Sequence, residues 1–334
     1  MSEVDSKLFN HPILITGGAG FIGSHFINEI LSMNPDKEIL NLDCISYATS
    51  SKTLDLFNDF KNYQFKKIDI NNFEDVLLAF KSFKPDIVVH FAAESHVDNS
   101  LAGPKIFLET NIMGTFNLLQ ASVEIKKIVP SFIFHHVSTD EVYGDLDFHD
   151  PRFTESSSYK PSSPYSASKA SSDLLVQSWA RTYDLNFIIT NCSNNFGARQ
   201  HTEKLIPTVI RKILSNKKIP IYGNGLNIRD WIFAQDHAQA IISIHEHGLI
   251  DERINIGGDH EISNLSLVKH ILKMMDCNED LIEFVDDRLG HDLRYAIDNT
   301  KIYSLTNWRP TQDFDANIQE TIEWYQNNPN WWES

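Results

Sequence analysis

Residues 13–24 read ILITGGAGFIGS, an apolar run followed by closely spaced glycines. Gly17, Gly20 and Gly23 fit the pattern GxxGxxG, and the later GxGxxG spacing begins at Gly18. Glycines at this spacing permit a tight turn after a strand and let the backbone approach a pyrophosphate, which then lies at the positive end of the next helix. The segment predicts a strand, a dinucleotide-binding turn and a helix beginning near Phe21. Taken alone, it also fits a glycine-rich turn without a ligand.

Apolar runs of strand length alternate with longer amphipathic segments through the first 195 residues. Strands are expected at 12–16, 38–43, 64–68, 86–93, 131–138 and 186–193. Helices are expected over 21–33, 73–83, 105–127 and 164–183. Strands that are apolar almost throughout are buried on both faces, and the helix-length gaps allow parallel crossovers. The order predicts an α/β protein with a Rossmann-type, doubly wound parallel sheet.

The alternation loosens after Asn195, which indicates a second domain. We expect residues 1–195 to form the Rossmann domain, with 228–258 returning to it. Residues 196–227 and 259–334 are then expected to form a smaller, interleaved C-terminal α/β domain. In an open parallel sheet, ligands bind beyond the carboxyl ends of the strands. The residues that follow those ends are therefore the candidates for a site.

Composition and charge exclude several classes of protein. The chain has 334 residues, with 29 basic against 45 acidic side chains and a formal net charge of −16. Excess negative charge argues against binding nucleic acid or an anionic membrane surface. No apolar window approaches the roughly 18 residues of a membrane span, and residues 1–10 lack the features of a signal peptide. Three cysteines without a CxxC pair favour a reducing compartment, so we expect a cytoplasmic protein.

Acidic residues at two expected strand ends favour a nicotinamide dinucleotide. Asp43 lies at the end of the second strand, twenty positions beyond Gly23. A carboxylate there accepts hydrogen bonds from ribose hydroxyls and repels a 2′-phosphate, so NAD is favoured over NADP. Asp69 and Ile70 follow the third strand and could receive the adenine edge, although a helix cap before Asn71 explains the same residues equally well.

The pattern Tyr-x-x-x-Lys occurs twice, but only one copy can act as a unit. Tyr63 and Lys67 fall on an expected strand, where four residues span roughly 13 Å. Tyr165 and Lys169 follow a helix-start signal, and positions four apart on a helix are neighbours. A lysine ammonium and a nearby positive nicotinamide ring would lower the pKa of the phenol towards neutrality, which suits a base that takes a hydroxyl proton. The alternative is an exposed polar first turn.

The strand at 131–138 leads into two adjacent carboxylic acids, Asp140 and Glu141. At a strand end the backbone can turn both side chains toward one ligand. Each carboxyl shifts the pKa of the other, so one can remain a protonated acid while the other is an ionised base. The alternative is a solvated acidic loop.

Four histidines, His90, His96, His135 and His136, raise the question of a metal site. No spacing of carboxylates or cysteines completes such a site, and His135 and His136 should project to opposite faces of a strand. We therefore expect no metal and interpret these residues as core or loop histidines.

Together these residues resemble the extended short-chain dehydrogenase/reductase family and, within it, the nucleoside-diphosphate-sugar 4,6-dehydratases, most closely those that act on dTDP-glucose. The resemblance covers almost the whole chain. The most specific motif is the run from Thr139 to Glu141, because sugar epimerases on this scaffold lack its paired carboxyl groups. The matching segments are TGGAGFIGS at 16–24, FAAESHVDNS at 91–100, STDEVYG at 138–144, PSSPYSASKASSDLL at 161–175, CSNNFG at 192–197, EKLIP at 203–207, PIYGNGLNIRDW at 220–231, NIGG at 255–258 and DRLGHDLRYAID at 287–298.

The resemblance implies a lyase that converts dTDP-glucose to dTDP-4-keto-6-deoxyglucose. Hydride passes from C4 to NAD while Tyr165, supported by Lys169 and assisted by Thr139, removes the C4 hydroxyl proton. Glu141 then removes the C5 proton, Asp140 protonates the departing C6 hydroxyl, and the hydride returns to C6.

The same matching implies two sets of binding residues, in the Rossmann domain for the cofactor and chiefly in the smaller domain for the nucleotide sugar. NAD is expected at Gly17, Gly20, Phe21, Ile22, Gly23, Asp43, Ser46, Asp69, Ile70, Ala92, Ala93, Ser95, Thr110, Tyr165 and Lys169. The nucleotide sugar is expected at Ser95, Thr139, Asn194, Asn195, Lys204, Leu205, Pro220, Tyr222, Arg229, Asn264, Arg288 and His291. Arg229 and Arg288 suit the diphosphate, because guanidinium groups bind phosphate oxygens in pairs. A surface ion pair would explain either arginine equally well.

Three departures from the family pattern concern the nucleotide sugar. The family usually has arginine at the position of Asn99 and often at that of Leu293, and a GPYQFP-like run where 197–202 reads GARQHT. The reaction type is less sensitive to these changes than the nucleotide. UDP-glucose and UDP-N-acetylglucosamine are therefore alternative substrates.

Two other functions are compatible with part of the pattern. A nucleotide-sugar epimerase or net oxidoreductase would use the glycine loop and Tyr165 but leave Asp140 and Glu141 idle. A silent NAD-binding regulator would have no need for Tyr165 and Lys169 one helical turn apart.

The family also implies a homodimer, formed by the helices near 105–127 and 164–183. An apolar stripe of Leu174, Leu175 and Trp179 is compatible with such a contact. Burial of the stripe against its own sheet is the simpler explanation for any one of these residues.

Overall fold

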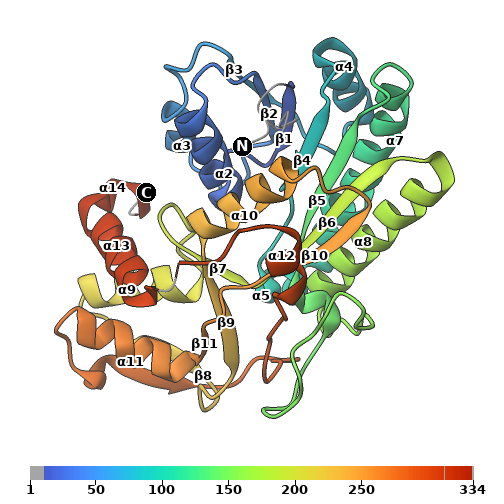
Figure 1. The fold of residues 1–334 in the computed structure, drawn as a ribbon. Coiled ribbons are helices and arrows are strands. Elements are labelled where there is room, and N and C mark those ends of the chain that lie inside the picture. The colour runs from blue at the N-terminus through green and yellow to red at the C-terminus, as the bar shows by residue number, and fades with distance from the viewer. Residues whose placement is uncertain (1–10, 312, 333–334) are drawn as a thin grey trace.

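A seven-stranded parallel sheet organises the structure, a computed structural model that describes residues 11–311 and 313–332 (Figure 1). In spatial order its strands are β10 (Glu252–Ile256), β6 (Asn186–Cys192), β5 (Ile133–Thr139), β4 (Ile87–His90), β1 (Ile13–Thr16), β2 (Ile39–Asp43) and β3 (Tyr63–Lys67). The chain starts at the centre, where Ile13 lies opposite both Ile39 and Ile87, and then winds outward in both directions. This order confirms the predicted Rossmann-type fold. The prediction that there is no signal peptide rests on residues 1–10, and these lie outside the described residues.

Helices cover both faces of the sheet. One face carries α2 (Phe21–Met33) and α10 (Ala234–Glu246), and the other carries α4 (Phe73–Phe83), α7 (Thr115–Lys126) and α8 (Pro164–Tyr183). Side chains alternate along a strand, so Ile13 and Ile15 enter the core beneath α2 and α10 while Leu14 enters the core beneath α4, α7 and α8. The near-continuous apolar runs of the central strands follow from this burial on two faces.

The outermost strand, β3, differs from the prediction. It is only partly buried, and Gln64, Lys66 and Lys67 are exposed. The expectation of burial on both faces is wrong here because β3 lies at the edge of the sheet and pairs with β2 alone.

The helix expected over 105–127 is divided in three. It consists of α6 (Pro104–Phe107), a π-helical segment η1 (Leu108–Gly114) and α7. A Cβ at Gly114 would come within 2.4 Å of the Ile70 side chain, so the glycine permits a close approach to the loop after β3. Within η1, Asn111 donates to the carbonyl of Glu94 at 3.0 Å. The π-helical turn therefore holds the loop that follows β4.

The second half of the chain adds two small sheets. One contains β11 (Glu261–Ser263), β9 (Ile228–Phe233) and β7 (Asn194–Phe196), and the other contains β12 (Ile282–Val285) and β8 (Ile219–Tyr222). Helices α9 (Leu205–Leu214), α11 (Asn264–Met274) and α13 (Phe314–Asn327) share one apolar core with these sheets. The shorter segments are α3 (Lys52–Asp55), α5 (Val97–Ala102), η2 (Asp140–Tyr143), η3 (Glu279–Leu281), α12 (Thr300–Leu305) and α14 (Pro329–Trp332).

Residues 228–258 contribute to both parts of the molecule. Strand β9 belongs to the three-stranded sheet, whereas α10 packs on α2 and β10 pairs with β6. The division into 1–195 with 228–258, and 196–227 with 259–334, stays a prediction.

The apolar stripe of α8 is divided between core and surface. Leu175 and Trp179 pack against the core beneath the helix, so the explanation by ordinary burial holds for them. Leu174 is 58% exposed. Across the described residues, no helix combines the length and apolar character needed to cross a membrane.

Candidate active site

Two adjoining cavities lie at the carboxyl ends of the central strands. The glycine-loop cavity, of about 250 Å³, extends from the loop after β1 to the first turns of α8. The arginine cavity, of about 330 Å³, extends from α5 to the second half of the chain. Both cavities are lined by Ser95, Glu141, Asn194, Asn195, Gln200, Glu203 and Lys204. The two cavities therefore share part of their wall.

The glycine loop has the shape of an anion cradle. Gly17 has a φ of +74°, and a Cβ there would lie 2.6 Å from the backbone nitrogen of Ala92. Gly20 precedes α2 without a side-chain cap, and the first turn of α2 carries no acidic residue. The free N–H groups of such a helix end attract a phosphate. The loop therefore fits the pyrophosphate of a dinucleotide.

Asp43 lies behind this loop and holds it in place. Its carboxylate accepts from the backbone N–H of Ala19 at 3.0 Å and of Ile45 at 2.8 Å. Burial raises the pKa of Asp43. Asn41, two residues earlier on β2, accepts from the N–H of Gly18 at 3.0 Å. Sequence reasoning missed Asn41, although a polar residue inside an apolar strand was a usable signal.

The predicted cofactor residues fall into two groups, those that line the glycine-loop cavity and those that do not. Those that line the glycine-loop cavity are Gly17, Gly20, Phe21, Ile22, Gly23, Ser46, Ala93, Ser95, Tyr165 and Lys169. Those outside its lining are Asp43, Asp69, Ile70, Ala92 and Thr110. Asp69 is exposed and accepts from the N–H of Asn71 at 2.9 Å, whereas the side chain that caps α4 is that of Asn72. The assignment of Asp69 to the cofactor stays a prediction.

Tyr165 and Lys169 lie side by side in the first turns of α8. Ser163 and Ser166 form a reciprocal capping box, and Pro164 occupies the first turn, so the helix begins where the sequence predicted. Both side chains are buried, which excludes an exposed polar turn. Lys169 donates to the carbonyl of Val137 at 2.9 Å, and burial lowers its pKa to about 8.

The pKa of Tyr165 runs against the prediction. In the protein alone, burial raises it well above the usual value, and the charges of Glu141 and Cys192 raise it further. A hydrogen bond with Thr139 acts in the opposite direction. A lowered pKa therefore requires the positive nicotinamide ring that the prediction also invoked. Cys192, which lines the same cavity, was missed because a lone cysteine in a strand carries no signal.

Asp140 and Glu141 lie together at the end of β5 and face the same cavity as Tyr165. Asp140 is buried and Glu141 is half-buried, which excludes a solvated acidic loop. Burial, together with the charges of Glu141 and Asp230, raises the pKa of Asp140 well above its usual value. Burial also raises the pKa of Glu141, but the charges of Lys204 and other basic groups act to lower it. The two carboxyl groups therefore differ in proton affinity.

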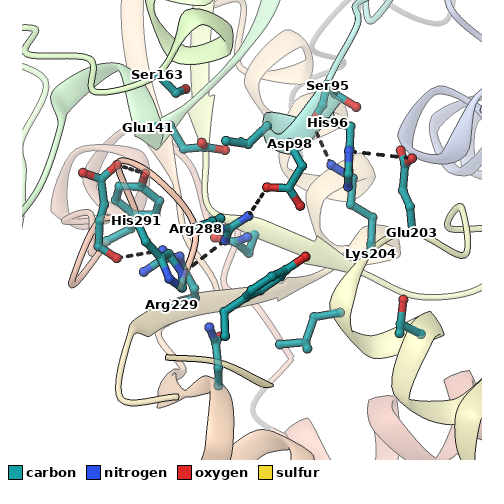
Figure 2. A pocket seen from close by; sticks show the side chains of 18 of the residues that line it. Ser95, His96, Asp98, Glu141, Ser163, Glu203, Lys204, Arg229, Arg288 and His291 are labelled. Carbon is teal, nitrogen blue, oxygen red and sulfur yellow. Dashed lines mark hydrogen bonds and ion pairs between the residues drawn. The ribbon is translucent and has the colours of Figure 1, made fainter. Parts of the chain in front are cut away.

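The arginine cavity collects the predicted sugar-nucleotide residues (Figure 2). Its lining includes Ser95, Asn194, Asn195, Lys204, Leu205, Pro220, Tyr222, Arg229, Asn264, Arg288 and His291, whereas Thr139 faces the glycine-loop cavity. Arg229 donates to the carbonyl of Asp292 at 2.9 Å and lies 4.2 Å from the centre of the Tyr295 ring. Arg288 pairs with Asp98 at 3.3 Å. Tyr295 and Asp98 were not predicted from the sequence.

The three departures from the family pattern lie at or beside the cavities. Asn99 is exposed and donates to the hydroxyl of Tyr47 at 2.9 Å. His201 lies 3.6 Å from Glu203 and lines the glycine-loop cavity. Leu293 donates its backbone N–H to Asp145 and lines neither cavity.

The buried histidines have partners within the fold. His135 contacts His245 of α10 at 2.9 Å, and His136 lies 3.3 Å from Asp173 of α8, so the two project to opposite faces as predicted. His90 is hydrogen-bonded to Thr16.

Comparisons with known proteins agree with this geometry. The model of the family described as GDP-mannose 4,6 dehydratase matches residues 14–321. The dTDP-glucose 4,6-dehydratase of Neisseria meningitidis serogroup B is 45% identical over 338 residues, which cover 96% of this chain and 95% of that protein. A solved structure also matches, the crystal structure of the dTDP-glucose 4,6-dehydratase DesIV from Streptomyces venezuelae with NAD and TYD bound. Its TM-score is 0.91 at 40% sequence identity, and the match covers 96% of this chain and 99% of that one.

The fold extends to more distant enzymes. The UDP-glucose 4-epimerase of Thermotoga maritima matches with a TM-score of 0.85 at 24% identity, and covers 95% of this chain and 99% of that one. The similarity at this level concerns the fold alone. By its family match over residues 14–321 and its relatives, the chain belongs to the GDP-mannose 4,6 dehydratase family of extended short-chain dehydrogenase/reductases, which confirms the resemblance of its motifs.

Proposed function

We propose that this chain is an NAD-dependent dTDP-glucose 4,6-dehydratase, a hydro-lyase that produces dTDP-4-keto-6-deoxyglucose. The observation that carries the proposal is that the glycine loop, Tyr165 and the pair Asp140 and Glu141 line one cavity. Relatives with about 45% identity over nearly the whole chain are dTDP-glucose 4,6-dehydratases.

The glycine loop and the first turn of α2 would hold the pyrophosphate of NAD. Tyr165 and Lys169 would lie beside its reactive end, because they line the same cavity as the glycine loop. When bound, the nicotinamide supplies a hydride acceptor and, later, a hydride donor. The chain's own residues move the protons.

The enclosed groups divide the proton transfers between them. Tyr165 takes the C4 hydroxyl proton, with the Lys169 ammonium stabilising the phenolate. Asp140, whose pKa is raised well above its usual value, remains a carboxylic acid and protonates the departing C6 hydroxyl. Glu141, whose raised pKa is moderated by basic neighbours, removes the C5 proton and later returns a proton to C5.

The arginine cavity would bind the diphosphate and nucleoside. Arg229 and Arg288 supply positive charge that the acidic chain otherwise lacks. A panel of dTDP-, UDP-, CDP- and GDP-sugars, scored by the loss of one water, tests the choice of nucleotide. Turnover of a UDP-sugar with none of dTDP-glucose would replace the proposed substrate.

Deuterated water tests the reaction type. With dTDP-glucose, the product is expected to carry deuterium at C5 and a methyl group at C6. A product with an unlabelled C5, an epimer without loss of water, or cofactor binding with no turnover would each overturn the dehydratase.

We also propose that the chain forms a homodimer and works in the cytoplasm. Exposed apolar side chains gather on α5, α6, η1 and α8, which contact one another. These side chains are Leu101, Ile106, Leu108, Met113 and Leu174. The cytoplasmic proposal rests on three unpaired cysteines, one of them in the active site. Light scattering at micromolar concentration tests the dimer.

A further inference from the structure

Arg199 is a departure from the family pattern that lies beside the glycine loop. The run GARQHT at 197–202 places arginine where the GPYQFP-like pattern has tyrosine. The Nε of Arg199 donates to Oγ of Ser24 at 3.0 Å. Ser24 belongs to the first turn of α2, and its hydroxyl donates to the carbonyl of Phe21 at 2.8 Å. A residue of the second half of the chain therefore brings a positive charge to the helix end that would hold the pyrophosphate of NAD.

The loop on either side of Arg199 is fixed by contacts with the rest of the fold. Before it, the carbonyl of Ala198 accepts from Nε2 of His25 in α2 at 2.9 Å. After it, the carbonyl of Gln200 accepts from the hydroxyl of Tyr325 in α13. Arg199 itself has a left-handed backbone with a φ of +66°, a conformation that residues other than glycine rarely adopt. The guanidinium group is therefore held against α2 by the conformation of the loop.

The charge of Arg199 has no counter-ion within the described part of the chain. No carboxyl group there hydrogen-bonds to Arg199 or raises its pKa, and Nη2 is buried without a hydrogen-bond partner. Burial lowers the pKa of Arg199 to about 10, which still leaves the guanidinium charged at neutral pH. A buried charge without a partner costs stability, and its presence next to a cradle for anions points to an anionic ligand.

The titratable groups that surround Arg199 are neutral. Burial and the charge of Arg199 lower the pKa of His25 to about 3, so its imidazole is uncharged at neutral pH. Burial raises the pKa of Tyr325, so its hydroxyl keeps its proton. Neither group therefore cancels the charge of the guanidinium.

The glycine-loop cavity has little positive charge of its own. Its lining contains the acids Asp140, Glu141 and Glu203 but only the lysines Lys169 and Lys204. The first turn of α2 reads FIGS, so it offers backbone N–H groups and no basic side chain. The positive end of a helix amounts to roughly half a charge. A full positive charge beside that end would add substantially to its attraction for a pyrophosphate.

We propose that Arg199 is a buried positive charge that strengthens the binding of the NAD pyrophosphate at the first turn of α2. Arg199 lines neither cavity, and its charge acts over a distance because the interior of a protein screens charges weakly. It is therefore a positioning residue. The inference rests on the proposed function and assigns part of the cofactor affinity to the loop in which this chain departs from its family.

The test compares Arg199→Gln with the charge-retaining Arg199→Lys. Each protein is titrated with NADH, whose fluorescence reports on the glycine-loop cavity, and the bound NADH is then displaced with NAD, ADP or adenosine. Arg199→Gln is expected to weaken the binding of NADH, NAD and ADP by about tenfold each, because all three carry the pyrophosphate. Adenosine has no phosphate, so its affinity is expected to change by less than about two-fold. Arg199→Lys is expected to bind all four ligands nearly as wild type does.

Arg199→Met repeats the test with an apolar side chain, and Arg181→Gln, at the exposed end of α8, is the control that is expected to match wild type. Equal weakening of ADP and adenosine in Arg199→Gln and Arg199→Met would mean that the loop is distorted. An unchanged ADP affinity would mean that the charge does not act on the cofactor. Either result overturns the inference, and the proposed function still stands if wild type makes the ketosugar. If wild type binds no NADH, both fail.

Discussion

Two neighbouring carboxyl groups, Asp140 and Glu141, have different surroundings, which agrees with the different roles proposed for them. Asp140 is enclosed and feels the negative charges of Glu141 and Asp230, whereas Glu141 also faces basic groups such as Lys204. The first environment favours an acid that keeps its proton and the second a base that can release one.

Removing the charge of Glu141 tests this division. Glu141→Gln is expected to lower kcat by about 10²-fold or more, the usual scale for a general base, and to abolish deuterium uptake at C5. The control is Glu283→Gln on the exposed face of β12, which is expected to match wild type. An almost unchanged turnover in Glu141→Gln would favour an epimerase.

Asp173 is predicted to keep Lys169 charged. It lies one helical turn beyond Lys169, accepts from Tyr159 at 2.7 Å and lies 3.3 Å from His136. Burial lowers the pKa of Lys169 to about 8, and the charge of Asp173 opposes that shift. In Asp173→Asn the pKa of Lys169 is expected to fall further, so the alkaline limb of the kcat/KM profile moves to lower pH.

The control for this prediction is Asp184→Asn, at the exposed end of the same helix. It is expected to leave the alkaline limb in place. If Asp173→Asn retains its fold by circular dichroism and its alkaline limb of kcat/KM stays at the wild-type pH, the pKa of Lys169 does not depend on Asp173.

At the scale of elements, the glycine loop depends on close contact between the end of β1 and the loop after β4. Gly17→Ala combines a left-handed backbone, at a φ of +74°, with a Cβ 2.6 Å from a backbone atom. We expect it to abolish measurable NAD binding in a calorimetric titration. Gly248→Ala has a similar φ of +65° but no atom within 4 Å, so it should lose only about 1–2 kcal/mol of unfolding free energy and keep full NAD affinity.

The contact between β5 and α10 predicts a pH-dependent stability. Burial lowers the pKa of His245 to about 3, well below its value of 6.5 when unfolded. The unfolded chain therefore binds the proton first, and the stability that neutral His245 contributes is present above pH 6.5 and is lost as the pH falls toward 3. Relative to His245→Asn, wild type is expected to lose about 2 kcal/mol between pH 8 and pH 5.

Urea unfolding of both proteins across this range measures the difference. His247→Asn, at an exposed position just beyond α10, serves as the control for the loss of a histidine at this end of the helix. A flat difference for His245→Asn would mean that His245 is not held neutral in the folded protein.

At the scale of the whole molecule, the exposed apolar side chains of α5, α6, η1 and α8 predict the assembly. Leu174→Glu places a charge at a 58% exposed position and is expected to convert a dimer to a monomer in light scattering. Leu226→Glu, on a 49% exposed leucine of the second half, is expected to leave the mass unchanged. A wild-type protein that is already monomeric would contradict the proposed homodimer.

Local patterns in the sequence were sufficient for the fold class of the large sheet, the start of α8 and the preference for Tyr165 over Tyr63. Strand burial, helix capping and the distance between positions four apart depend on nearby residues, so they can be derived from a short window. The π-helical segment within 105–127 could not be derived in this way, because the residues that its Asn111 and Gly114 contact, Glu94 and Ile70, are distant in sequence.

The sequence by itself determined the fold class and the glycine loop, and it singled out Asp140, Glu141 and Tyr165 as the candidates for the acid, the base and the phenol. Only the tertiary structure decided that Asp43 supports the loop from behind, that Asn41 assists it, and that Asp140, Glu141 and Tyr165 line one cavity. The pKa shifts of these groups also depend on the tertiary structure, because burial and the charges of residues distant in sequence act only after the chain has folded.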